Sequence, residues 1–424
     1  MLNEKMCSNS EDLARCFFIG MLTITSVYFI ANAVCEGAFL NACFQGTSWN
    51  SFTDYFNLIE YVRQGDPYSL SSNYTAINFV IVKCLFQLIP RQDLVGMSSP
   101  AEEVLALRNT TSALISFILF TLVTILIIAF CIRKLLSRFS EITKNLGVAA
   151  ILLSSPSLFL IERGNLLLLT LAALLFFFCF RKSDQKWQRI LAGLALALAS
   201  AMKLYPAVFA LLYLKEKKIR EFIFVTITGF ALLIIPFFIF NGVSSIEDFV
   251  IGMSASVNAE LGMGNNYSFS NLIRILYALI CGKIGQIGII GSIIPFVLTI
   301  TTYLLAKNEW EKLLSLGIMC VWVPSFSYAY TLLLLLPGML SLLVAKEETD
   351  KYRLLCLILI FVIMVPIPLG LVEPIAKLMP EVNFPLSWSV VIGNIALLLL
   401  ETSILIKNIF KLREKLNNEQ IMQA

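Results

Sequence analysis

Long apolar stretches recur along this chain, with short polar segments between them. Three of the stretches, residues 13–34, 112–132 and 354–372, together contain a single charged residue, Arg15. A helix needs about 20 apolar residues to cross the hydrocarbon core of a bilayer. The pattern therefore predicts an all-α polytopic membrane protein.

Read along the whole chain, the same pattern predicts about twelve membrane segments. A polar loop is expected at residues 241–271, with residues 272–281 lying at the outer surface. Residues 191–214 are counted as two half-helices. The other segments are expected at residues 13–35, 109–132, 146–161, 166–180, 222–240, 284–306, 312–326, 328–345, 354–372 and 387–406.

Residues 36–107 separate the first two segments and are expected to carry helices at the membrane surface. Within them, residues 73–90 are apolar, but Lys83 stands in the middle. A lysine at the bilayer centre costs about 2.5–3.5 kcal/mol on insertion scales. This part is therefore predicted to lie at the interface. The alternative, that residues 74–90 cross the membrane, would invert every later orientation.

Residues 191–214 have the length of one span, yet basic residues flank them on both sides. The positive-inside rule places both flanks in the cytosol. Pro206 ends or kinks a helix, and non-helical backbone is tolerated at membrane depth where it lines a water-filled cavity. The prediction is two half-helices that meet at residues 203–206, with Lys203 at the floor of an outward-facing cavity.

Charge and composition add an orientation and several exclusions. Most of the 32 Lys and Arg residues fall on one side of the predicted topology, which makes both termini cytosolic in a multi-pass protein of the plasma (inner) membrane. The chain has no histidine and no CxxC pair among its ten cysteines, so no metal site and no cofactor are expected. A net charge of +4 is too small to predict nucleic-acid binding.

Polar residues from at least five segments fall on the outer side of this topology. A carboxylate together with deep cations suits an anionic, phosphate-bearing substrate and a group that needs a base. The candidates are Asp54, Asp66, Tyr68, Arg163, Asn165, Lys203, Tyr205, Asn266, Arg274 and Tyr328.

Simpler explanations compete for four of these residues. Ser51 to Asp54 matches a capping box, in which Asp54 only caps a helix over residues 52–64. Asp66 precedes a proline and follows a glycine, which is turn chemistry. Arg163 and Lys203 are also explained as helix-end residues that snorkel outward, although an intramembrane lysine is by default a functional hypothesis.

The order of these motifs resembles glycosyltransferase family 87, within the GT-C superfamily of polyprenol-phosphate-sugar-dependent enzymes. The resemblance extends over residues 12–345. The matching pieces are Asp54-Tyr55, Gly65-Asp-Pro-Tyr68, Ser155-Pro156, Gly164-Asn165, Ala192-Gly193, Lys203-Leu-Tyr-Pro206 and Asn266-Tyr-Ser268.

The resemblance implies a GT-C-like catalytic membrane bundle over residues 13–345, with an active-site loop at residues 36–107. Residues 1–12 would then be a cytosolic N-terminus, residues 346–406 C-terminal membrane helices and residues 407–424 a basic cytosolic tail. The active site would face outward, and members of the family are similar to mannosyl- and arabinosyltransferases of envelope glycolipids and polysaccharides.

Roles follow residue by residue from the same resemblance. Asp54 matches the catalytic base, and Lys203 matches the place where the donor phosphate is held, with Arg163 and Arg274 assisting. Substrate binding is assigned to Asp66, Tyr68, Asn165, Tyr205, Asn266 and Tyr328. The expected partners are a polyprenyl-phosphate sugar donor, a glycolipid or glycan acceptor and membrane lipid.

The chain also departs from the family pattern. Tyr74-Thr-Ala-Ile stands where members often have two prolines after the loop tyrosine, and Ser327-Tyr-Ala-Tyr330 stands where many carry a histidine. Two other functions remain open from the residues alone. A transporter or flippase of a polyprenyl-linked or anionic solute would use the same cations without needing Asp54 as a base, and a structural envelope subunit would need neither Asp54 nor Lys203.

Overall fold

The computed structural model describes residues 2–40, 43–44, 51–68, 72–87, 104, 106–258, 264–283, 285, 287–345, 351–372 and 386–423. Within these residues the regular elements are all helices, and β-structure is confined to two isolated bridges. The prediction of an all-α protein is thus confirmed for the described part of the chain.

The chain divides into two compact units, and neither is continuous in sequence. Unit 1 comprises Met1–Phe44, Leu135–Leu158 and Leu261–Ala424, and unit 2 comprises Gln45–Lys134 and Phe159–Glu260. The predicted boundary between residues 345 and 346 therefore falls inside unit 1.

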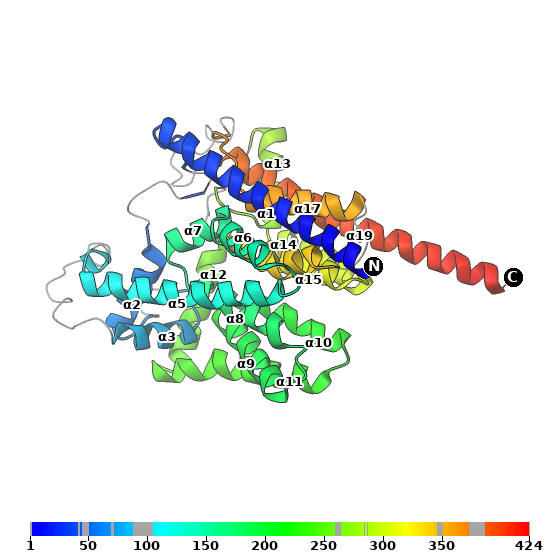
Figure 1. Ribbon diagram of the computed structural model, residues 1–424. Coiled ribbons are helices and arrows are strands. Elements are labelled where there is room, and N and C mark those ends of the chain that lie inside the picture. The colour runs from blue at the N-terminus through cyan, green and yellow to red at the C-terminus, as the bar shows by residue number, and fades with distance from the viewer. Residues whose placement is uncertain are drawn as a thin grey trace. The chain divides into compact units, whose positions relative to one another are not determined.

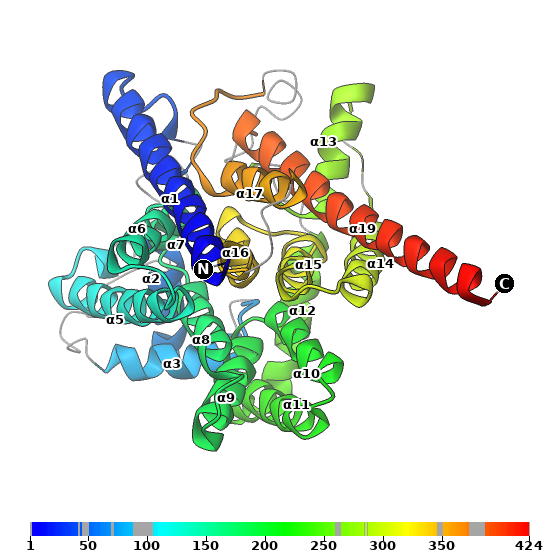
Figure 2. The ribbon, with the colours of Figure 1, turned by 45° about the vertical axis from the view of Figure 1, so that its right-hand side comes forward.

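Unit 1 is a bundle of apolar helices (Figure 1). Within it α15 packs against α14 and α16, while α19 packs against α14, α15 and α17, so these helices lie side by side in both ribbon views (Figures 1 and 2). Its elements are α1 (Leu2–Val34), α6 (Glu141–Leu152), α13 (Phe269–Cys281), α14 (Ile290–Leu305), α15 (Glu309–Trp322), η6 (Ala329–Leu335), α16 (Leu336–Leu343), α17 (Lys351–Met364) and α19 (Trp388–Gln423).

Unit 2 holds α2 and α3 against a layer of longer helices. In that layer α9 packs between α8 and α11, as Figure 2 shows. Its elements are α2 (Thr53–Arg63), α3 (Ala76–Phe86), α5 (Thr111–Leu135), α8 (Leu167–Phe180), α9 (Lys186–Met202), η4 (Tyr205–Ala210), α10 (Leu211–Lys215), α11 (Ile219–Ile234), η5 (Ile235–Ile239) and α12 (Val243–Asn258). Helix α7 (Ser155–Arg163) runs from unit 1 into unit 2.

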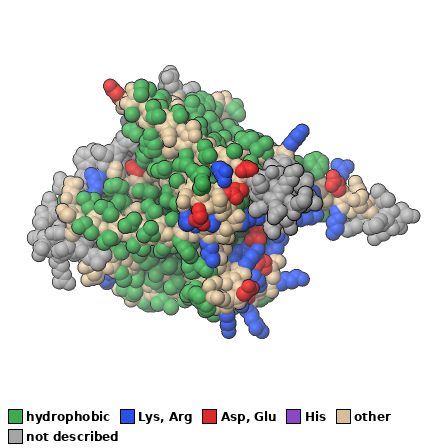
Figure 3. Space-filling model, viewed as in Figure 1, with side chains coloured by type: hydrophobic (Ala, Val, Ile, Leu, Met, Phe, Trp, Pro, Cys, Tyr) green, Lys and Arg blue, Asp and Glu red, His purple; other side chains and the backbone are tan. Residues whose placement is uncertain are grey.

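Four helical segments in the described residues are long and apolar enough to cross a bilayer. They are Ser10–Val34, Thr111–Leu135, Ile219–Ile239 and Trp388–Asn418, and the pair α6 and α7 makes a fifth when it is taken as one span. Side chains of α5 such as Ile118 and Leu126 are more than half exposed, as lipid contact requires. Apolar side chains also cover much of the face shown in Figure 3. The protein is a helical membrane protein, but the predicted number of about twelve segments is not confirmed.

The span predicted at residues 146–161 is not one continuous helix, because the helix breaks after Leu152 and α6 and α7 bend by 55°. Pro156 has no N–H to donate within a continuous helix. The hydroxyls of Ser154 and Ser157 instead donate to the carbonyl oxygen of Ile151, at 2.7 and 2.6 Å. A Ser-Ser-Pro sequence therefore ends one helix and starts the next.

Helices also occupy segments that were predicted as a loop, an N-terminus and a tail. Helix α12 lies within the expected polar loop at residues 241–271. Residues 259–263 of that loop lie outside the described residues. Helix α1 begins at Leu2, inside the predicted cytosolic segment 1–12, and α19 continues to Gln423 through the predicted tail. Each of these two helices thus extends beyond its apolar part into sequence that was predicted to be cytosolic.

Short helices are present within the predicted loop, and the predicted break near Lys203 is also present. α3 has 11 residues, about 16 Å at 1.5 Å per residue, which is far short of the roughly 30 Å of a bilayer core. Residues 88–103, at the end of the predicted loop, lie outside the described residues. α9 ends at Met202, Lys203 has extended backbone (φ −138°, ψ 124°), and η4 follows from Tyr205.

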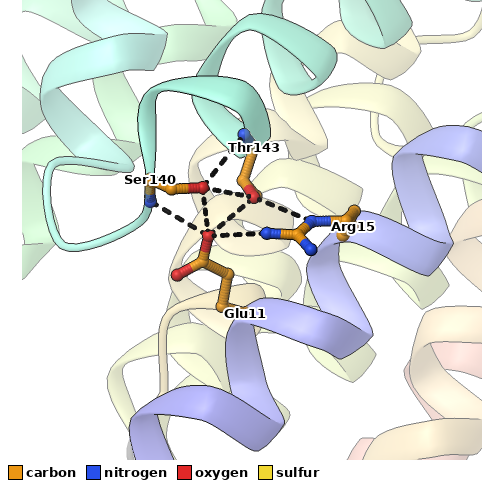
Figure 4. A network of polar contacts seen from close by, with 4 residues as sticks. All are labelled: Glu11, Arg15, Ser140 and Thr143. Carbon is orange, nitrogen blue, oxygen red and sulfur yellow. Dashed lines mark hydrogen bonds and ion pairs between the residues drawn. The ribbon is translucent and has the colours of Figure 1, made fainter.

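One carboxylate joins the beginnings of α1 and α6 in unit 1 (Figure 4). An oxygen of Glu11 accepts hydrogen bonds from the N–H and hydroxyl of Ser140, from the Thr143 hydroxyl at 2.8 Å and from Arg15 at 3.3 Å. Ser140 is the N-cap residue of α6, and its own hydroxyl accepts from the N–H of Thr143. The N-terminal part of α1 therefore lies beside the start of α6.

Replacing Glu11 with Ala should lower stability by about 1–2 kcal/mol, because it removes a charged acceptor from a helix N-terminus. Glu11→Gln keeps one acceptor oxygen and should lose less. Thermal unfolding in detergent measures both variants, and Glu414→Ala, which replaces an exposed carboxylate of α19, serves as the control. An unchanged melting temperature for Glu11→Ala would show that the network contributes nothing.

Candidate active site

Asp54 stands in the first turn of α2 and is 7% exposed. One of its carboxylate oxygens accepts from the guanidinium of Arg163, at the end of α7. The other accepts a 2.7 Å hydrogen bond from Nδ2 of Asn165. Arg163 and Asn165 are themselves only 9% and 1% exposed. Three residues that the sequence singled out therefore form one buried, hydrogen-bonded cluster in unit 2.

The Gly164-Asn165 turn explains how this cluster is built. Gly164 has φ +65°, and a Cβ there would lie 3.1 Å from Cβ of Tyr55 and 3.2 Å from Cα of Phe52. Only glycine combines that conformation with such a close approach to the start of α2. Oδ1 of Asn165 accepts from the N–H of Leu167 at 2.9 Å, which orients its amide nitrogen toward Asp54.

The structure does not support the capping explanation of Asp54. The N-cap residue of α2 is Phe52, which has φ +60° and provides no side-chain cap. Its N–H instead donates to the carbonyl oxygen of Glu162 at 2.6 Å. Because the carboxylate of Asp54 is bonded to Arg163 and Asn165, it faces the polar cluster.

Lys203 lies in the same unit, at the break that follows α9. It is half-buried, and its ammonium lies 4.5 Å from the centre of the Tyr74 ring. Among the described residues the ammonium has no carboxylate within ion-pair distance, and Asp54 is an acidic group whose charge acts on it. A cation held against a ring and not neutralised is available to an anion.

Two side chains at the start of α3 donate hydrogen bonds to the backbone carbonyls at this break. The carbonyl oxygen of Met202 would accept from residue 206 in a continuous helix, but Pro206 has no N–H. Asn78 donates to that oxygen at 3.0 Å. Thr75 donates to the carbonyl oxygen of Ala201 at 2.7 Å and to that of Met202 at 3.3 Å. The orphaned carbonyls are thus satisfied by two buried residues that precede them by more than 120 positions.

Asp66 and Tyr68, assigned to substrate binding, have structural partners. Asp66 accepts from the N–H of Tyr68 at 3.0 Å, which is the expected turn, and from Nδ2 of Asn241 at 2.6 Å. Tyr68 is 2% exposed, stacks on Phe237 and donates to the carbonyl oxygen of Tyr74 at 3.1 Å. Burial, and after it the Asp66 carboxylate, raise the pKa of Tyr68. Substrate contact by either residue stays a prediction.

The other three candidates belong to unit 1. Asn266 and Tyr328 form an isolated antiparallel bridge. Oδ1 of Asn266 accepts from the N–H of Ser327 at 3.0 Å, and its carbonyl oxygen accepts from Asn394 at 3.1 Å. Asn266 is therefore buried and connects the segment of Ser327 to helix α19 through hydrogen bonds. Tyr328 and Arg274 are half-buried. Their action together with the residues of unit 2 stays a prediction.

Sequence reasoning missed several residues around the cluster. Tyr74 and Thr75 were noted only within a departure from a family pattern, and Asn78 not at all. Tyr61 on α2 is another such residue. Burial, and after it the charge of the Asp54 carboxylate, raises the pKa of its hydroxyl. Tyr205, which was predicted, is half-buried at the start of η4. Only the proline at 206 carried a signal, since it implies that some other donor must satisfy the carbonyl of Met202.

The arrangement can accept a proton and hold an anion. A carboxylate has about four lone-pair sites, so the hydrogen bonds from Arg163 and Asn165 leave Asp54 able to accept one from an incoming hydroxyl. Lys203 supplies a separate positive charge for an anionic group.

Comparison with known proteins gives one match. Residues 104–345, more than half of the chain, match the profile of glycosyltransferase family 87. Arg163, Asn165, Lys203 and Tyr205 lie inside the matched range, whereas Asp54 precedes it. No curated protein and no solved structure matched the chain.

Proposed function

Because this chain belongs to glycosyltransferase family 87 and is therefore a membrane glycosyltransferase, we propose that it transfers a sugar from a polyprenyl-phosphate donor. The sugar is mannose- or arabinose-like, and the acceptor is an envelope glycolipid or polysaccharide. The reaction takes place on the external face of the plasma (inner) membrane, with both termini in the cytosol. No metal and no cofactor take part.

The observation that carries the proposal is the buried Asp54–Arg163–Asn165 cluster with the unneutralised Lys203 in the same unit. A sugar transferase that uses a lipid-phosphate donor needs a base for the acceptor hydroxyl and a cation for the leaving phosphate. Asp54 and Lys203 are of the required types. Structural ion pairs also occur in buried sites, but they do not require a second cation that, among the described residues, has no carboxylate within ion-pair distance.

The proposed reaction is a single displacement with inversion. An acceptor hydroxyl attacks the anomeric carbon from the face opposite the phosphate, and its proton passes to the carboxylate of Asp54. The bond between the anomeric carbon and the phosphate oxygen breaks, and polyprenyl phosphate leaves with the electron pair. Lys203 stabilises the charge that develops on that oxygen, with Arg163 or Arg274 assisting. Preorganised charge of this kind is usually the largest catalytic contribution.

Each assisting residue has a defined part in this scheme. Asn165 orients the carboxylate through its 2.7 Å hydrogen bond, and Arg163 holds it through an ion pair. Tyr205, Asn266 and Tyr328 contact the sugar or the acceptor, and Asp66 and Tyr68 shape the loop. The polyprenyl chain lies between membrane helices, where burial of each methylene group contributes about 0.8 kcal/mol.

The transporter alternative would use the same cations without a base. The family favours the enzyme, because the matched profile is that of a glycosyltransferase family. No feature of the described residues favours transport over transfer.

A donor panel tests the proposed function. Membranes that contain the protein, and matched membranes without it, are incubated with labelled polyprenyl-phosphate sugars, and label in glycolipid and polysaccharide is measured. We expect incorporation from one donor only in membranes with the protein, together with release of polyprenyl phosphate. Incorporation from nucleotide sugars but from no lipid-linked donor would overturn the donor assignment. Uptake of label into vesicles without a new glycosidic bond would favour the transporter.

A further inference from the structure

Tyr74 lies between the two charged parts of the site in unit 2. Its hydroxyl accepts a 3.4 Å hydrogen bond from Nδ2 of Asn165, the nitrogen that also holds Asp54 at 2.7 Å. On its other side, the ring centre is 4.5 Å from the ammonium of Lys203. An ammonium within about 6 Å of a ring centre is attracted by the ring quadrupole. One side chain therefore contacts both charged parts of the site.

The backbone of Tyr74 is tied down on both sides. Its N–H donates to the hydroxyl of Ser72 at 3.3 Å, and its carbonyl oxygen accepts from the hydroxyl of Tyr68 at 3.1 Å. The next residue, Thr75, is bonded to the carbonyl oxygens of Ala201 and Met202. Because Lys203 follows Met202 directly, these bonds hold the ring and the lysine backbone together.

A ring also suits this position better than a carboxylate. A carboxylate beside Lys203 would neutralise the ammonium and compete with an incoming phosphate for it. A ring attracts the ammonium but carries no net charge, so the positive charge remains available. Without a partner, the four-carbon side chain of a half-buried lysine would occupy several rotamers, and binding an anion would have to order them.

We propose that Tyr74 is a positioning residue, whose ring holds the ammonium of Lys203 at the donor phosphate site and whose hydroxyl steadies the Asn165 amide that orients Asp54. The proposal rests on the proposed function, because it takes the phosphate to bind at Lys203. It predicts that the ring governs binding of the phosphate and that the hydroxyl affects only turnover.

Binding of farnesyl phosphate, a short and soluble polyprenyl phosphate, separates these parts without knowledge of the sugar. Titration calorimetry on the full-length protein in detergent should show about 5- to 30-fold weaker binding for Tyr74→Leu, the range that a cation–π contact spans. Tyr74→Phe keeps the ring and should bind as wild type does. Binding of farnesol, which lacks the phosphate, should be the same in all three proteins.

Two further variants guard against a general loss of structure. A trifluorinated phenylalanine at position 74 keeps the shape of the ring but removes most of its quadrupole, so binding should weaken as it does for Tyr74→Leu. Tyr277→Leu, which replaces an exposed tyrosine of α13, should change nothing. Once the donor is known, Tyr74→Leu should raise its KM more than it lowers kcat, and Tyr74→Phe should lower kcat alone.

The outcomes distinguish this proposal from the function on which it rests. If Lys203→Met binds farnesyl phosphate normally, the phosphate role of Lys203 fails and the role of Tyr74 fails with it. If Lys203→Met weakens binding and Tyr74→Leu does not, only the role of Tyr74 is overturned. It is also overturned if Tyr74→Leu weakens binding by the same factor in the Lys203→Met background, since the ring would then not act through the lysine.

Discussion

Asp54→Asn should lower kcat by about 10²–10⁴-fold, the usual contribution of a positioned general base. Asparagine keeps the size of the side chain and can still accept from Arg163 or Asn165, but its amide cannot take the proton of an acceptor hydroxyl. The KM for the donor should change little, because Asp54 contacts the acceptor in the proposed mechanism. Initial rates with the donor identified by the panel, at equal protein level, measure both constants.

The ion pair with Arg163 makes one control necessary. Removing one partner of a buried pair costs about 3–5 kcal/mol, because the other charge is left uncompensated. Asp54→Asn should therefore also lower the melting temperature. The double variant Asp54→Asn/Arg163→Gln removes both charges, and it should regain stability while remaining inactive. A stable and active double variant would show that Asp54 serves only to neutralise Arg163.

Lys203→Met should lower kcat/KM by about 10²–10³-fold, comparable to the loss of one preorganised group that stabilises developing negative charge. Methionine keeps the length and apolar part of the side chain and removes the charge. In contrast to Asp54→Asn, stability should stay near that of the wild type, since no acidic partner of Lys203 is left behind among the described residues. The same kinetic assay and a thermal unfolding curve measure the two effects.

Lys83→Met is the matched control for this change. Lys83 is an exposed lysine of α3 in the same unit, and its ammonium lies 5.9 Å from the ring centre of Phe240. Its replacement should leave transfer intact. Full activity of Lys203→Met, or an equal loss for both variants, would refute a specific role of Lys203 in holding the donor phosphate.

Much of the site was predictable because its signals are local. Pro206 within an apolar stretch implies a helix break, and a lysine beside it implies a polar environment at that break. Gly164 and Asn165 predict a turn after Arg163, and the structure has a turn at this position. What these signals could not show is that the turn meets the first residues of α2, about 110 positions earlier.

Other features were missed for an identifiable reason. The break within residues 146–161 had a local signal in Ser155-Pro156, but apolar length outweighed it. Thr75 and Asn78 had no such signal, because a threonine and an asparagine at a helix start usually cap their own helix. In this protein they instead donate to the carbonyl oxygens at the end of α9, which no local pattern reveals.

By itself, the sequence determined that this is a helical membrane protein, that the chain breaks near Lys203 and that its motifs resemble those of a glycosyltransferase family. Hydropathy and proline content decide such features within a window of about 20 residues. Only the tertiary structure decided that Asp54 pairs with Arg163 and Asn165 instead of capping α2, and that Lys203 lies against Tyr74. The physical reason is that a buried polar group must find a partner wherever the folded chain supplies one, and distance along the sequence does not determine which residue that is.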